Sequence, residues 1–246
     1  MSYDDFSRYY DLLTDNVEYK KRADYFCRLL SLCGISGGIL LDLGCGTGSM
    51  SVKMVQRGFD VIGVDSSIGM LNAARQKAFE NETEVLLLNQ SMQEIDLYGT
   101  VDCAICVLDG LNHLESGADV RKTFEKVSLF MNKGGAFAFD VNTIHKHKNI
   151  LADNAFVFEP EGVFCAWQNS YNPLDNSVEI SLDFFEEEDG VYYRACESFT
   201  EKAYELDDIK SWLEDSGFEV VGIYDDMTTE NVKPDSERAV FLARKK

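Results

Sequence analysis

Short apolar runs alternate with amphipathic stretches through the first 142 residues of the chain. The runs predict buried strands at 39–41, 61–64, 84–88, 101–108 and 136–141. Apolar residues at helical spacing predict helices at 49–57, 67–79 and 120–131. The last of these helices is expected to end at the glycines of residues 133–135. Strands and helices that alternate in this order predict an α/β fold with a doubly wound, Rossmann-like parallel sheet.

The pattern changes to alternating apolar and polar residues after residue 143. Val178, Ile180, Leu182 and Phe184 share one face of an extended segment, with polar residues between them. Strands are predicted at 156–158, 163–170, 178–186 and 191–200, separated by turn-forming residues. We expect an antiparallel β-meander, inserted as a lid over the carboxyl ends of the parallel strands, where ligands bind in such sheets.

The last 42 residues return to the α/β pattern. A helix is predicted at 205–216, closed by Gly217, and strands are predicted at 218–224 and 238–243 as a hairpin. The chain is therefore expected to have three parts. Residues 1–143 hold N-terminal helices and the first part of the Rossmann-like domain, residues 144–204 the β-insertion, and residues 205–246 the completion of that domain.

Composition limits the classes of binding partner and indicates the cellular compartment. The formal net charge is −20, which disfavours nucleic acid and anionic membrane surfaces as partners. No apolar run is long enough for a membrane span, and the N-terminus lacks the features of a signal peptide. Seven cysteines without a disulfide-like framework indicate a reducing, cytoplasmic setting. Monomer and homodimer both remain open, because the insertion could shape a pocket or a dimer interface.

A glycine-rich segment follows the first predicted strand. Leu40 to Ser49 reads L-L-D-L-G-C-G-T-G-S, with the pattern D-x-G-x-G-x-G. Glycine lets the backbone turn sharply and approach a ligand closely. The spacing differs from the G-x-G-x-x-G of dinucleotide-binding folds, whose helix N-terminus receives a pyrophosphate.

This segment resembles the first motif of class I S-adenosylmethionine (SAM)-dependent methyltransferases. With the β-insertion, the chain resembles small-molecule members of that family, including sugar-amine methyltransferases. The resemblance implies SAM as cofactor and S-adenosylhomocysteine as product. It also implies that the glycine loop passes beside the ribose and methionine of SAM and that the aspartate lies near the methionine amino group. The loop residues concerned are Asp42, Gly44, Cys45, Gly46 and Gly48. Asp42 could equally tie down the loop at the strand end, and the two roles are compatible.

Asp65 ends the second predicted strand about 20 residues after the glycines, at the offset where an acid meets ribose hydroxyls. The alternative is a helix N-cap, a role that Ser66 or Ser67 can fill instead. The resemblance places Ser66 and Met70 beside the adenosine. It also places Ser91 where the family usually has an acid that receives the adenine amino group, with Met92 either on the ring or in packing.

The loop after the fourth strand, Leu108 to Leu114, reads L-D-G-L-N-H-L and opens at the carboxyl edge of the sheet. It resembles the D-S-L-N-Y-L segment of small-molecule methyltransferases, which puts Leu108 beside the cofactor sulfonium. Asp109, His113 and Asn112 are the candidate catalytic residues, with Asp109 or His113 as general base. A surface histidine is the alternative for His113. We expect no metal, because the three histidines form no cluster in the sequence, and residues 145–147 read most simply as a polar connector.

The N-terminus resembles the Y-x-x-F-A-x-x-Y-D opening of this family, in which tyrosines fold over the cofactor and touch its carboxylate. Tyr10 and Tyr3 match those positions, whereas Phe6 and Tyr9 are expected to pack on the core. Arg22 stands where relatives often have tryptophan. Residues 197–204 resemble E-x-H-x-Q-R-x-Y, with Phe199 in place of histidine, and either line the acceptor pocket or form a polar strand face.

We therefore expect a SAM-dependent methyltransferase that acts on a small-molecule acceptor, at nitrogen or oxygen rather than carbon. The altered residues Arg22, Ser91 and Phe199 keep open a SAM-binding protein without transferase activity. A nucleotide-dependent oxidoreductase would use the same fold, but the chain lacks the G-x-G-x-x-G motif.

Overall fold

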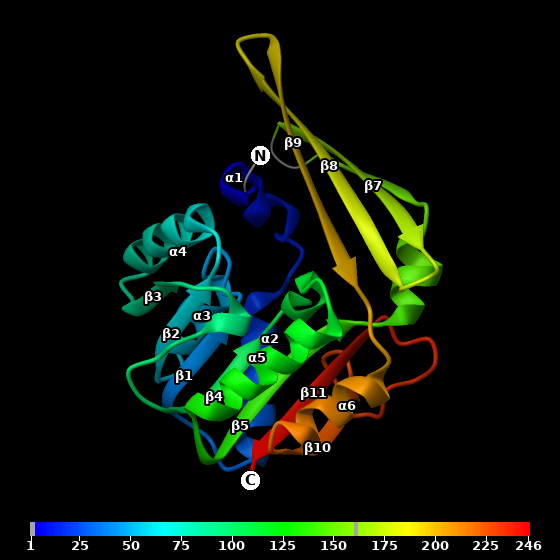
Figure 1. Ribbon diagram of the computed structural model, residues 1–246. Coiled ribbons are helices and arrows are strands. Elements are labelled where there is room, and N and C mark those ends of the chain that lie inside the picture. Colours follow the sequence, from blue (N-terminus) through cyan, green and yellow to red (C-terminus); the bar gives the residue numbers. More distant parts are fainter. Residues whose placement is uncertain (1–2, 160–161) are drawn as a thin grey trace.

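The computed structural model describes residues 3–159 and 162–246, with the side chains of residues 3–6 and 8 left aside (Figure 1). Its helices are α1 (Tyr3–Leu13), α2 (Tyr19–Leu32), α3 (Ser49–Val55), α4 (Ile68–Glu80), α5 (Gly117–Phe130) and α6 (Leu206–Asp215). Single turns are η1 (Met92–Glu94), η2 (Gly110–His113) and the π-helical η3 (Lys146–Leu151).

Eleven strands of the described chain form two sheets. The first sheet holds β1 (Gly38–Leu43), β2 (Phe59–Asp65), β3 (Val85–Asn89), β4 (Val101–Cys106), β5 (Met131–Asn142), β10 (Phe218–Asp225) and β11 (Arg238–Lys245). Their order is β10-β11-β5-β4-β1-β2-β3, with β11 antiparallel to both of its neighbours. The second sheet is the antiparallel β6 (Ala155–Phe158), β7 (Val163–Asn172), β8 (Ser177–Glu188) and β9 (Val191–Lys202). The predicted α/β fold with an antiparallel insertion is confirmed.

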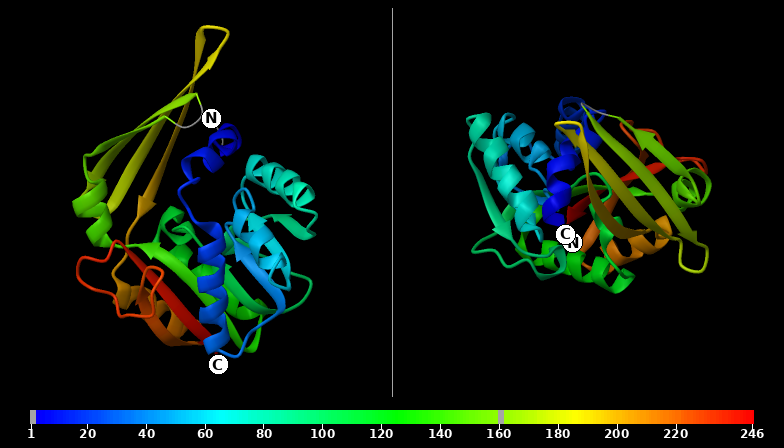
Figure 2. Two further views of the ribbon diagram at one scale, coloured as in Figure 1. Left: turned by 180° about the vertical axis from the view of Figure 1, so that it is seen from behind. Right: turned by 90° about the horizontal axis from the view of Figure 1, so that it is seen from above.

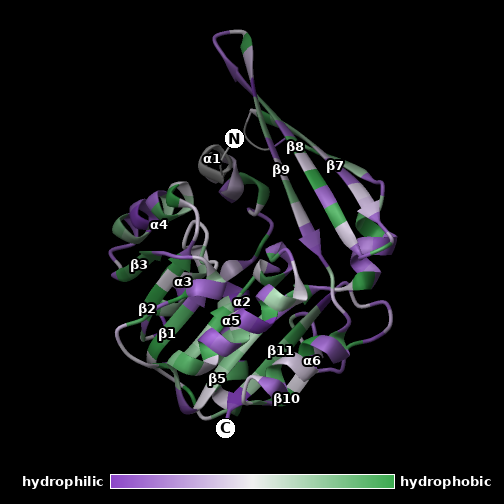
Figure 3. Ribbon diagram, in the orientation of Figure 1, coloured by the Kyte–Doolittle hydropathy of each residue, from purple (hydrophilic) through white to green (hydrophobic). Residues whose placement is uncertain are grey.

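Both faces of the seven-stranded sheet are covered by helices. One face packs on α5 and α6 through side chains such as Phe124, Val127 and Leu213. The other face packs on α2 and α3 through side chains such as Phe26, Leu29 and Met54. Strands buried in this way are mostly apolar, as the green centre of the sheet in Figure 3 shows. No helix of the described residues is long and apolar enough to cross a membrane.

The insertion has an apolar face and a polar face. Val178, Ile180, Leu182 and Phe184 are buried on the same side of β8, as their alternation predicts. That side faces α1, which lies between the insertion and α4 (Figures 1 and 2). Tyr9 of α1 stacks on Phe184 with the ring centroids 4.4 Å apart. Tyr9 therefore packs as expected, but on the insertion rather than on the parallel sheet.

Two local expectations are wrong. The helix predicted to run to the glycines ends at Phe130, and Met131 already belongs to β5, where it pairs with Val101. Gly134, at φ 81°, lies inside β5 and not at a helix end. Residues 145–147, expected as a polar connector, enter the turn η3, which buries His147 and Leu151 under the insertion.

Candidate active site

The glycine loop joins β1 to α3 at the carboxyl edge of the sheet. Gly44, Gly46 and Gly48 have φ of 65°, 53° and 76°, a region that side chains other than glycine rarely adopt. A Cβ on Gly48 would stand 2.9 Å from the Cβ of Ala74, and one on Gly44 would overlap the Met92 methyl. The tight packing lets α3 and α4 lie together and leaves the loop backbone open to a ligand. Cys45, between the first two of these glycines, has a buried side chain.

Asp65 fixes the loop from the end of β2. Its carboxylate accepts hydrogen bonds from the backbone N–H of Gly46 at 2.9 Å and of Ser67 at 2.8 Å. Ser67 caps α4 by accepting from the Met70 N–H, so the helix cap does not depend on Asp65. Burial raises the pKa of Asp65, against the lowering effect of its hydrogen bonds. Each carboxylate oxygen has a second lone pair, so the group retains the capacity to accept from two ribose hydroxyls.

Asp42 lies under the loop at the end of β1 and is buried. It accepts a hydrogen bond from the Ser51 hydroxyl at 2.5 Å, which ties β1 to α3. Burial raises its pKa to about 6. This geometry supports the strand-end role that the sequence suggested beside the cofactor role.

The Asp42 carboxyl predicts a pH dependence of folding. The carboxyl keeps its proton up to about pH 6 in the folded state, whereas the pKa of a free aspartate is 3.8. The folded state therefore binds more protons than the unfolded state between these values, and the stability due to Asp42 falls as pH rises through this window. Urea unfolding of the wild type and Asp42→Asn from pH 4 to 7 measures this contribution. A difference between the two that does not vary with pH would contradict it.

The predicted adenosine contacts lie in different environments. Ser66 is exposed, and Ser91 is partly exposed at the start of η1. Met92 is half-buried and packs against the parallel-sheet core. Met70 is buried in the cluster that joins α1 to the insertion, which favours packing over contact with a ligand.

The loop after β4 has a strained start. Leu108 and Asp109 have φ of 62° and 54°. Their backbone N–H groups donate to the two carboxylate oxygens of Asp140, at 3.1 and 2.7 Å. Because Asp140 lies in the neighbouring strand β5, the strain at Leu108 is held by the sheet itself. Strain held in this way turns the Asp109 side chain toward the sheet edge.

Asp109 belongs to an ion-pair network that sequence reasoning missed. Arg238, in β11, pairs with both Asp109 and Asp140. Arg22, in α2, binds Asp226 through two hydrogen bonds of 3.0 Å and lies 3.5 Å from Asp140. No local pattern in the sequence shows that Arg238 would meet Asp109 across 129 positions.

His113 lies between two carboxylates. Its Nε2 is 4.0 Å from Oδ2 of Asp109 and 4.0 Å from Oε1 of Glu201, at the end of β9. The Phe199 ring lies beside it, with the centroids 5.2 Å apart. Phe199 therefore lines the site, whereas Arg194 pairs with Asp183 on the exposed face of the insertion.

Glu201 is a second residue that sequence reasoning missed, because it stands where the related segment has glutamine. It is buried, and burial alone would raise its pKa. His147, His113 and a hydrogen bond from Asn142 at 2.9 Å outweigh burial and lower the pKa to about 2. Glu201 is therefore ionised at neutral pH.

Asp109, His113 and Glu201 bring three ligand atoms within 4.8 Å of one another, a group that could hold a metal ion. Sequence reasoning did not foresee this group. The cations of Arg238 and Lys146 lie close by, and burial beside Arg238 lowers the pKa of Lys146. Because neighbouring positive charge opposes a divalent ion, the absence of a metal stays our prediction.

Asn112 is used in the scaffold. It is buried, and its amide donates to the carbonyls of Asn142 and Lys202 while its oxygen accepts from the Asn142 N–H. These bonds join η2 to β5 and β9. The geometry favours a structural role for Asn112 over the catalytic one.

Tyr10 reaches the same edge. Burial, with Tyr19, Asp109 and Asp11 nearby, raises the pKa of its hydroxyl well above the usual value. The side chain of Tyr3 lies outside the described residues, so its predicted contact with the cofactor carboxylate stays a prediction.

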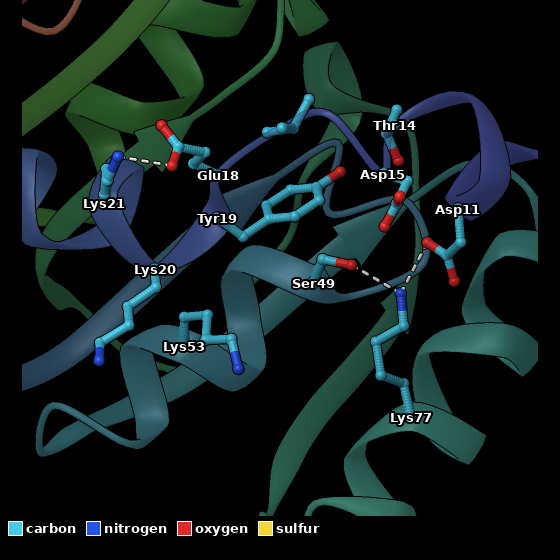
Figure 4. Close-up of a pocket in the computed structure, with 11 residues that line it drawn as sticks. Asp11, Thr14, Asp15, Glu18, Tyr19, Lys20, Lys21, Ser49, Lys53 and Lys77 are labelled. Atoms are coloured by element: carbon cyan, nitrogen blue, oxygen red, sulfur yellow. Dashed lines mark hydrogen bonds and ion pairs between the residues drawn. The ribbon is translucent and has the colours of Figure 1, made fainter.

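A cavity of about 500 Å³ lies beside the glycine loop, between the first two helices and α3 (Figure 4). Some of its charged groups are paired: Lys77 bonds Asp11 and the Ser49 hydroxyl, and Lys21 bonds Glu18. Asp65 and Ser91 do not line it. This cavity is therefore separate from the predicted cofactor residues.

The fold and the glycine loop define a class of protein. Residues 40–135 match the methyltransferase domain family. A methyltransferase homologue from Geobacillus sp. (strain WCH70) is 34% identical over all of both chains. The chain belongs to the SAM-dependent methyltransferases.

Solved structures and a more distant relative extend the comparison. A SAM-dependent methyltransferase from Clostridium acetobutylicum ATCC 824 has a TM-score of 0.89 and 27% identity, covering 99% of this chain and 98% of that one. The sugar N-methyltransferase KedS8 of Streptoalloteichus shares the fold, with a TM-score of 0.79 and 18% identity over 100% and 93% of the two chains. A glycine/sarcosine N-methyltransferase from Parasynechococcus marenigrum (strain WH8102) is 29% identical over 66% of this chain and 57% of its own.

Proposed function

We propose that the protein transfers the methyl group of SAM to the nitrogen of a small-molecule amine. The observation that carries this proposal is the position of Asp109, His113 and Glu201. Three acceptor atoms from two segments, the loop after β4 and the end of β9, converge at the carboxyl edge of the sheet. An ammonium group has three N–H donors, which three such acceptors can receive. The glycine/sarcosine relative, an N-methyltransferase, supports nitrogen over oxygen.

The residues fit SAM in two respects. The glycine loop has room for close approach of a ligand, and Asp65 has lone pairs left for ribose hydroxyls. Bound SAM would supply a methyl group made electrophilic by its sulfonium. Asp109 and Glu201 would hold the acceptor in line with that methyl, which is the main task when the donor is already reactive.

His113 would take the proton that an ammonium must lose before its nitrogen can act as nucleophile. The nitrogen then forms its bond to the methyl carbon as the carbon–sulfur bond breaks, and the sulfur keeps the electron pair. Glu201 is ionised, and Arg238 holds one oxygen of Asp109 so that the other faces His113. The Phe199 ring and the insertion would exclude water from the reacting atoms.

Two measurements on the purified protein test the proposal. Calorimetric titration with SAM, S-adenosylhomocysteine and NADH should show micromolar binding of both sulfur ligands and none of NADH. A panel of primary and secondary amines, matched with alcohols of the same carbon skeleton, should then yield S-adenosylhomocysteine with amines only. Transfer to the alcohols alone would overturn the amine assignment. Binding of SAM without product from either set would favour a binding protein that lacks transferase activity.

Asp109→Asn should lower turnover at least tenfold while SAM affinity stays within about threefold. The amide keeps the shape of the side chain but supplies one acceptor atom and no charge to the acceptor site. Steady-state kinetics and calorimetry on the same preparation measure the two effects. Asp189→Asn, at the exposed turn of the β8–β9 hairpin, is the matched control. Unchanged turnover in Asp109→Asn would remove this residue from catalysis.

A further inference from the structure

His147 is fully buried where the insertion meets the parallel sheet. It lies in η3, between β5 and β6, and its Nδ1 is 2.9 Å from the carbonyl oxygen of Asn176, in the β7–β8 turn. A carbonyl oxygen can only accept a hydrogen bond. Nδ1 therefore carries a proton and donates a hydrogen bond to the Asn176 carbonyl. Whether the ring is neutral or cationic then depends on whether Nε2 also carries a proton.

The Nε2 atom faces a carboxylate. It lies 3.5 Å from Oε2 of Glu201 and has no hydrogen-bond partner among the described residues. If the ring were neutral, its lone pair would point at an anion in the protein interior, and neither atom could donate. A buried contact of this kind, with two acceptors and no donor, is unfavourable. A proton on Nε2 turns the same contact into an ion pair.

The proton belongs on the ring and not on the carboxyl. A free carboxylic acid is more acidic than imidazolium by about two pKa units. Glu201 Oε2 already accepts from the Asn142 amide, a bond that favours the ionised carboxylate. The other titratable side chains that contact Glu201 or its partner Asn142 are His113, on Oε1, and Lys146, whose Nζ bonds Asn142. None of these takes the place of the ring at Oε2.

We infer that His147 is a positioning residue, present as an imidazolium, that fixes the Glu201 carboxylate with Oε1 turned toward the acceptor amine. The catalytic consequence rests on the proposed function of Glu201, whereas the protonation state does not. His147 also bonds the root of the insertion in two places, since Asn176 and Glu201 lie at the near ends of its hairpins. The His147 cation thus stabilises the ionised Glu201 carboxylate at the acceptor site. It also fixes the base of the insertion through Asn176.

The chain holds three histidines, so nuclear magnetic resonance can read the ring directly. Histidine labelled with ¹⁵N in the ring is incorporated into the full chain, and long-range ¹H–¹⁵N spectra are recorded at pH 7.5. We expect one histidine with both nitrogens protonated, whose signals disappear in His147→Asn. In Glu201→Gln the same ring should lose its second proton and become a neutral Nδ1–H tautomer.

Assignment does not depend on a single variant. If His147→Asn fails to fold, His145→Gln and His113→Gln identify the other two rings, and His147 follows by elimination. A neutral His147 in the wild type, or a ring that stays cationic in Glu201→Gln, would overturn the inference.

The protonation state and the amine assignment fail separately. A cationic His147 in a protein that methylates no amine would refute the proposed function alone. A neutral His147 in a protein that does methylate amines would refute the positioning role alone.

Discussion

Replacement of Asp65 by alanine should weaken SAM binding at least 100-fold. The carboxylate is the candidate partner of both ribose hydroxyls, and charge-assisted hydrogen bonds contribute about twice as much as neutral ones. It also orders the loop through Gly46 and Ser67, so the variant loses both the contact and the shape of its site. Calorimetric titration with SAM and with S-adenosylhomocysteine measures the loss for each ligand.

Two further variants separate these causes. Asp65→Asn keeps one acceptor for the loop but removes the charge. Its affinity for SAM should lie between those of the wild type and Asp65→Ala. Asp60→Ala, on an exposed position of the same strand, should bind as the wild type does. Wild-type affinity in Asp65→Ala would refute the ribose assignment.

Replacement of Arg238 by methionine should destabilise the protein by about 3–5 kcal/mol, since it removes the cation that contacts both Asp109 and Asp140 and leaves Asp140 with only the longer contact to Arg22. Arg238 is nearly buried and neutralises both Asp109 and Asp140, of which Asp140 is fully buried. For a chain of this size the loss corresponds to a fall in Tm of roughly 10 °C or more. Thermal unfolding followed by circular dichroism measures it.

A double variant tests the reason for this loss. Adding Asp140→Asn to Arg238→Met removes the buried carboxylate that has lost its shorter ion pair, and should recover part of the stability. Arg244→Met, at an exposed position of the same strand, is the matched control and should leave Tm within about 2 °C. A fall in Tm equal in the two single variants would show that the ion pairs contribute nothing specific.

The sequence predicts those parts of the molecule that depend on local pattern. The order of strands and helices follows from hydrophobic periodicity, and alternation in Val178 to Phe184 predicts the insertion. The position of Asp65 beside the glycine loop is predictable because both lie within one β-α-β unit. Local spacing carries the information in each case.

Contacts between distant segments are not predictable in this way. Glu201 meets His113 and His147 only because β9 ends above the loop after β4, and Arg238 of β11 reaches Asp109 across the intervening strand β5. A polar run such as His145 to His147 reads as an exposed connector, since no local pattern shows that a turn will carry one ring beneath the insertion. Which charged side chains meet at the sheet edge depends on the order of the strands in the sheet, and not on the hydrophobic periodicity of the sequence.

The stack of Tyr9 on Phe184 has a consequence for the rate at which ligands come and go. Tyr9 also donates a hydrogen bond to Glu186. Helix α1 therefore contacts the inner face of the insertion through both an aromatic stack and a hydrogen bond. Any motion that swings α1 aside uncovers Val178, Ile180 and Leu182 to water at the same time. If the cofactor leaves when α1 moves aside, the transition state exposes more apolar surface to water. Hydration of apolar surface raises the heat capacity. The logarithm of the cofactor release rate should therefore curve when plotted against reciprocal temperature, and Tyr9→Ala should both speed release and straighten the plot.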